Sequence, residues 1–119
     1  MISEEEKDIA TDYILLGILI EQIEDDLKTF HEAPVKLYEP YNNLLESILK
    51  EVRRDLTITK AKMKEQGIKV LSGIPINEDF IEYKYYVRGY NAQFHFFNAA
   101  LRNYVTKKMG TYLGIPGSY

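Results

Sequence analysis

Cysteine is absent from the 119 residues of the chain, and long hydrophobic runs are absent as well. Without cysteine there are no disulfide bonds, no thiolate zinc sites and no cysteine nucleophile, which agrees with a reducing cytosol. The longest apolar run covers residues 13–20 and is far shorter than the roughly 20 residues that cross a bilayer. Acidic residues occupy positions 4–6, where a secretory signal would be basic and then apolar. We therefore expect a soluble cytoplasmic protein with no membrane partner.

Groups that suit catalysis or metal binding are scarce. Of the two histidines, His31 lacks a second metal ligand at helical spacing, and His95 is expected on a solvated helix face. Carboxylates gather at residues 21–26 without the glycine and alternating oxygen ligands of a calcium loop. The sequence has no glycine-rich phosphate loop and no credible Ser-His-Asp set. We expect no catalytic residue, no metal ligand and no cofactor, and hence a protein that is not an enzyme.

Charge is distributed unevenly although the net charge is only −3. Residues 1–32 carry ten acidic and two basic groups, whereas residues 33–119 carry eight acidic and thirteen basic groups. One explanation is that the two parts attract each other within the fold or between subunits. The other is a basic surface that meets an anionic partner.

A helix is predicted from Ser3 to about Glu32. Ser3 and Glu6 have the spacing of a capping box, in which each side chain accepts a hydrogen bond from the other residue's backbone. Apolar residues then recur every three or four positions from Ile9 to Phe30, as on one face of a helix.

The middle of this helix is apolar on most sides, because Leu15, Ile18 and Leu19 widen the apolar stripe. Such a segment has to be covered on two faces, either within the domain or by a second subunit. We expect these three residues to mediate self-association, with a homodimer favoured.

A second helix is predicted from near Pro40 to Gly67. Proline is tolerated in a first turn because its missing amide hydrogen has no partner there, and glycine adopts the left-handed conformation that ends a helix. The short link between the two helices favours an antiparallel αα-hairpin.

The spacing of apolar residues changes after Gly67. A β-prone run at residues 68–71 and turn residues at 72–79 lead into strict alternation from Phe80 to Arg88. This alternation predicts a strand with a buried face and an exposed face, and the two strands form a β-hairpin at about residues 68–90. The buried face is predicted to hold Ile81, Tyr83, Tyr85 and Val87.

A third helix is predicted after Gly89, with Asn91 as its cap. Its apolar face is predicted to hold Phe94, Phe97, Leu101, Tyr104, Val105 and Met109. The predicted fold is therefore α+β and mainly helical: a long αα-hairpin, a short β-hairpin and a carboxy-terminal helix, in the order ααββα. We expect a single domain over residues 1–113 and a flexible tail over residues 114–119.

Basic and aromatic residues alternate on the predicted exposed face of the strand. This pattern suits nucleic acid, because cations neutralise phosphates and rings stack on bases. It also suits a protein interface, or simple packing of tyrosine rings with wet hydroxyls. The candidate partner-contact residues are Lys84, Tyr86, Arg88, Tyr90, His95 and Arg102, with Lys107 and Lys108 nearby.

The carboxy-terminal 40 residues or so resemble a known group of proteins. The resemblance rests on the run from Glu82 to Tyr90, then on Phe94, Leu101-Arg102, Lys108-Met109 and Tyr112-Leu113. This part of the chain is similar to small uncharacterised proteins of Gram-positive bacteria and their prophages. The resemblance implies an accessory or mobile-element setting and no particular activity, and the first two predicted helices contribute nothing to it.

Two hypotheses of function follow. The leading one is a non-enzymatic, self-associating module that binds a second subunit or another protein through its apolar helical face and the aromatic strand. The alternative is a small nucleic-acid-binding regulator that uses Lys84, Arg88, Arg102 and Lys107.

Overall fold

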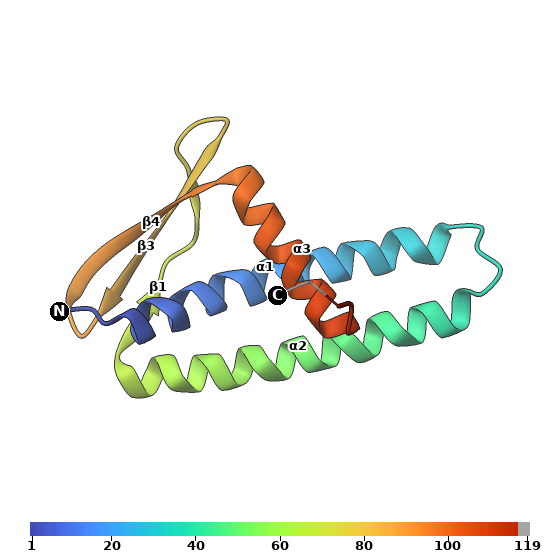
Figure 1. The fold of residues 1–119 in the computed structure, drawn as a ribbon, viewed down its shortest axis with the longest axis horizontal. Coiled ribbons are helices and arrows are strands. Elements are labelled where there is room, and N and C mark those ends of the chain that lie inside the picture. Colours follow the sequence, from blue (N-terminus) through green and yellow to red (C-terminus); the bar gives the residue numbers. More distant parts are fainter. Residues whose placement is uncertain (117–119) are drawn as a thin grey trace.

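Two 29-residue helices form the long axis of the molecule (Figure 1). They are α1 (Glu4–Glu32) and α2 (Tyr38–Gln66), which run antiparallel in the computed structural model that describes residues 1–116. The predicted capping box is confirmed, since the Glu6 amide donates to Ser3 Oγ at 3.1 Å and the Ser3 amide donates to Glu6 Oε1 at 2.8 Å. Gly67 ends α2 with a φ of 68°, as predicted.

The apolar stripe of α1 packs against α2 and forms the main core. Leu19, Ile23 and Val52 are almost fully buried there. Each such side chain stabilises the fold by about 1.5–3 kcal/mol through removal of apolar surface from water. None of the helices described within residues 1–116 is both long enough and apolar enough to cross a membrane.

A four-stranded antiparallel sheet packs over the amino-terminal half of α1 and the carboxy-terminal half of α2 (Figure 1). Its strands are β1 (Ile68–Val70), β2 (Ile74–Pro75), β3 (Phe80–Val87) and β4 (Tyr90–Phe97). The long strand β3 pairs with both β1 and β2 along one edge and with β4 along the other. Tyr85 and Val87 are buried against the helices, on the inner face that alternation predicts.

The predicted start of the third helix is wrong, because residues 90–97 form β4 and α3 (Asn98–Leu113) begins seven residues later than Asn91. Arg88 and Gly89 both have positive φ, at 48° and 88°, as in the type I′ turns that join hairpin strands. The chain therefore reverses at once and pairs with the whole of β3. The fold class is confirmed as α+β, but the order is ααββββα.

Helix α3 runs from the sheet back across α1 toward α2 (Figure 1). Leu101 and Val105 are buried in the main core, and the Tyr112 hydroxyl donates a hydrogen bond to the Asp55 carboxylate on α2. Gly114 ends α3 with a φ of 73°, and the Ile115 amide returns to the Gly110 carbonyl at 2.9 Å. The rest of the predicted flexible tail, residues 117–119, lies outside the described residues.

Candidate binding surfaces

The outer face of the sheet, which points away from the helices, carries three of the predicted partner-contact residues. Lys84 and Tyr86 alternate with the buried Tyr85 on β3, so they point outward. The register places Gln93 opposite Lys84, and His95 opposite Glu82. The structure therefore brings Lys84, Tyr86 and His95 to one surface.

Glu82 limits the positive charge of this face. His95 Nε2 lies 2.8 Å from Glu82 Oε2, and Lys84 Nζ lies 3.9 Å from Glu82 Oε1. One carboxylate therefore lies between two cationic or potentially cationic groups. The face is polar and aromatic rather than strongly basic.

Arg88 is occupied by a partner within the chain. Its guanidinium donates to both carboxylate oxygens of Glu6, at 3.3 Å from Nη2 to Oε1 and more closely from Nη1 to Oε2. The Glu6 side chain is only 8% exposed. The hydrogen bonds from Arg88 and from the Ser3 backbone lower the pKa of Glu6 from 4.5 to about 2. Arg88 thus joins the β3–β4 turn to the start of α1, while Tyr90 beside it remains exposed.

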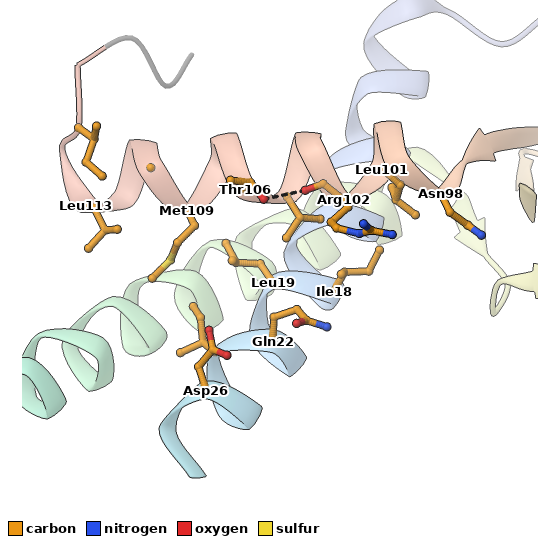
Figure 2. A pocket seen from close by; sticks show the side chains of 14 residues that line it. Ile18, Leu19, Gln22, Asp26, Asn98, Leu101, Arg102, Thr106, Met109 and Leu113 are labelled. Carbon is orange, nitrogen blue, oxygen red and sulfur yellow. Dashed lines mark hydrogen bonds between the residues drawn. The ribbon is translucent and has the colours of Figure 1, made fainter. Parts of the chain in front are cut away.

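Arg102 lies away from the sheet face and lines a groove between α1 and α3, which we call the α1–α3 groove (Figure 2). The groove has a volume of about 640 Å³. Ile18 lines it as well, so residues from both predicted sets meet there. Its apolar floor includes Leu19, Ile23, Leu101, Val105 and Met109.

Two of the three predicted self-association residues lie in the chain's own core. Leu15 and Leu19 are 9% and 2% exposed, and only Ile18 keeps partial exposure. A charge at Leu19 is therefore expected to disrupt the core rather than to separate two subunits. Of the three, only Ile18 has exposed surface with which it could contribute to self-association.

The basic residues proposed for nucleic acid are spread over the molecule. Lys84 lies on the outer sheet face, Arg88 contacts Glu6, and Arg102 lines the α1–α3 groove. Lys107 lies beside Tyr104 in a separate pocket of about 560 Å³. The four side chains do not form one continuous basic surface.

An exposed apolar patch that sequence reasoning missed covers one end of the outer sheet face. The rings of Phe80 and Phe97 lie 5.4 Å apart between centroids and are 40% and 47% exposed. Ile74 and Ile76 continue the patch and are 58% and 50% exposed. Alternation on β3 already placed Phe80 on this face, but Phe97 joins it only once residues 90–97 are recognised as a strand. We call these four residues the sheet-end patch.

Strand β4 is an open edge of the sheet. Among the described residues it pairs with β3 only. In a two-residue hairpin the pair that flanks the turn exchanges both backbone hydrogen bonds, and such pairs alternate along the ladder. Because Val87 and Tyr90 flank this turn, the amides of Asn91, Gln93 and His95 point away from β3. The Asn98 amide donates to the Asp79 carbonyl at 2.7 Å, which fits this alternation of inward-pointing and outward-pointing amides.

Within residues 1–116, no three histidine, aspartate or glutamate side chains are placed so that they could hold a metal ion. The surfaces offer hydrogen-bonding backbone, aromatic rings and an apolar groove, which are the means of binding.

The fold and these surfaces define a small α+β protein in which a helical hairpin carries an antiparallel sheet, with β4 as one edge strand among the described residues. The chain belongs to the YhjD protein family, whose model matches residues 1–117. It is also 26% identical to the uncharacterized protein YhjD of Bacillus subtilis (strain 168), over 97% of this chain and 95% of the relative. No solved structure matches.

These matches support the predicted similarity to small proteins of Gram-positive bacteria and correct its extent. The similarity is not confined to the carboxy-terminal 40 residues, because both long helices lie within the matched range. The aromatic run from Glu82 to Tyr90 makes the carboxy-terminal part distinctive, whereas ordinary helical sequences carry few distinctive residues.

Proposed function

We propose that the protein is a non-enzymatic interaction module that self-associates as a dimer through the β4 edge. The observation that carries this proposal is the open edge itself, eight residues long and without lysine, arginine, aspartate, glutamate or proline. Soluble proteins usually protect such edges with charge, proline or a covering segment, since an open strand is a template for another chain. An accessory or prophage-encoded role, as the resemblance implies, belongs to the same proposal.

The edge is self-complementary in one antiparallel register. A twofold axis at Phe94 places Gln93 opposite His95 of the second copy, and Asn91 opposite Phe97 of the second copy. The amides of Asn91, Gln93, His95 and Phe97, which all point away from β3, are then paired. The two sheets join into one continuous sheet, and the sheet-end patch of each copy lies on its outer face.

The test places lysine on the edge. Because lysine side chains on an edge strand oppose edge-to-edge pairing, Asn91→Lys combined with Gln93→Lys is expected to convert a dimer into a monomer. Light scattering at tens of micromolar measures the mass, and circular dichroism checks the fold. Both side chains are exposed in the single chain, so the variant is expected to stay folded, with its melting temperature lowered only by the loss of dimerisation.

A matched control adds the same charge elsewhere. Asn43→Lys combined with Ser47→Lys changes two exposed residues of α2, far from the sheet, and is expected to remain dimeric. A strictly monomeric wild type, or an edge variant as dimeric as the control, would refute pairing through β4.

A further inference from the structure

The α1–α3 groove is an apolar depression with polar groups at its rim (Figure 2). Its volume of about 640 Å³ is within the range of small-molecule sites, which hold roughly 300–1,000 Å³. Leu113 and Ile115, at the carboxy-terminal end of the groove, are 39% and 50% exposed. The groove therefore leaves apolar surface uncovered along much of α3.

The two charged rim residues lie at different places along the groove. Figure 2 shows Arg102 beside Asn98 and Ile18 near the start of α3, whereas Asp26 lies on the α1 wall farther along. Among residues 1–116, no carboxylate lies within ion-pair distance of the Arg102 guanidinium. Asn98 is already engaged, since its Nδ2 donates to the Glu78 carbonyl at 3.1 Å. An anionic group that enters this end finds a cation that no described carboxylate already pairs with.

We propose that the α1–α3 groove binds a single-chain amphiphile with a carboxylate head, such as a long-chain fatty acid. The head pairs with Arg102, and the alkyl chain lies over Val105 and Met109 toward Leu113. The guanidinium fork matches carboxylate geometry, and the first turn of α3, which contains no acidic residue, adds the positive end of the helix dipole.

The dimensions and charges select this orientation. From Leu101 to Leu113 the helix rises about 18 Å, at roughly 1.5 Å per residue, which is long enough for an extended alkyl chain. The Asp26 carboxylate, on the α1 wall away from Arg102, repels an anionic head at that end of the groove. The charged head therefore has one favourable position, and the alkyl chain has one direction.

The test uses dodecanoate below its micelle concentration and follows the methionine methyl groups by NMR. Met109 lines the groove, whereas Met63 is buried in the second core cluster and serves as an internal control. A saturable shift of Met109 with one dodecanoate per chain, and no shift of Met63, is the expected result.

Two variants and a neutral probe identify the role of Arg102. Arg102→Ala is expected to weaken dodecanoate binding about tenfold, as expected when a charge-assisted hydrogen bond is lost. Arg54→Ala, which removes an exposed arginine of α2, is expected to leave binding unchanged. Dodecanol is expected to bind wild type as weakly as dodecanoate binds Arg102→Ala.

The proposal is overturned if Met109 does not shift, or if Arg102→Ala binds dodecanoate as tightly as wild type does. An equal affinity for dodecanol and dodecanoate would also overturn it. Although Asn98, which lines the groove, directly follows Phe97 at the end of β4, the mass measured by light scattering without dodecanoate tests self-association separately.

Discussion

At the scale of single residues, Glu6 connects the start of the chain to the β3–β4 turn. Its carboxylate completes the capping box of α1 and accepts hydrogen bonds from Arg88, which is 82 residues away in the sequence. Both interactions favour the ionised carboxylate, which is why the pKa of Glu6 falls to about 2. The stability contributed by Glu6 is therefore linked to pH.

We predict that Glu6→Gln weakens the pH dependence of the free energy of unfolding at acidic pH. The pKa of Glu6 is lower in the folded chain than its ordinary value of 4.5, so its contribution is present above pH 4.5. This contribution is lost progressively as the pH falls from 4.5 to about 2. Urea unfolding at several pH values measures the effect. Glutamine still supports a capping box, so the variant mainly removes the charge.

Glu4→Gln is the control for this prediction. Glu4 lies in the same first turn, but its side chain is 87% exposed and forms an ion pair with Lys7 at 3.6 Å. This variant is expected to keep the pH dependence of wild type. If Glu6→Gln and Glu4→Gln show the same slope between pH 2 and 4.5, the assigned role of Glu6 is wrong.

At the scale of elements, two glycines occupy opposite environments. A Cβ atom added at Gly73, between β1 and β2, would lie 2.6 Å from Tyr83 Cζ and 2.8 Å from Ile81 Cδ1. A Cβ atom added at Gly17, inside α1, would meet nothing within 4 Å. The connection between β1 and β2 therefore needs glycine in order to lie against β3, whereas α1 does not need it.

We predict that the same glycine-to-alanine change has opposite effects at these two positions. Gly73→Ala is expected to lower the free energy of unfolding by about 1–3 kcal/mol through overpacking against Tyr83. Gly17→Ala is expected to raise it by about 0.5–1 kcal/mol, since alanine favours a helix interior. Urea unfolding of both variants measures this. Changes of the same sign would contradict the packing described around Gly73.

The helical hairpin could be predicted from the sequence because its signals are local. The capping box at Ser3 and the left-handed end at Gly67 act within one turn of the helix. Strand β4 could not be predicted this way, because the spacing of Phe94, Phe97 and Leu101 also fits a helix. Pairing with β3 and the turn at Arg88 decide the outcome, and both depend on tertiary context.

The binding surfaces were predictable only in part, for the same reason. Alternation on β3 placed Lys84 and Tyr86 outward, as the structure shows. The α1–α3 groove depends on where α3 crosses α1, which brings Ile18 next to Arg102 across the fold. No spacing within the sequence encodes that crossing.

At the scale of the whole molecule, the acidic first segment and the basic remainder meet within one chain. Ion pairs join Glu6 to Arg88, Asp12 to Lys108 at 3.6 Å, and Glu24 to Arg53 at 3.0 Å. These contacts account for part of the charge asymmetry without an anionic partner. The sheet-end patch and the β4 edge then remain as surfaces without a partner among residues 1–116.

The register proposed for the dimer predicts contacts that one chain cannot make. With the twofold axis at Phe94, Ala92 lies opposite Phe96 of the second copy in a pair without mutual hydrogen bonds. Their Cα atoms would be about 4.5 Å apart in such a pair. Within one strand these residues are four positions apart, about 13 Å at roughly 3.3 Å per residue.

The central claim, self-association through β4, is tested most directly by an isotope-filtered NOE experiment on mixed labelled and unlabelled chains. We predict an intermolecular NOE between the Hα atoms of Ala92 and Phe96, and another between the two Phe94 Hα atoms. A dimeric sample that shows neither signal, or a sample that stays monomeric at tens of micromolar, would contradict the account.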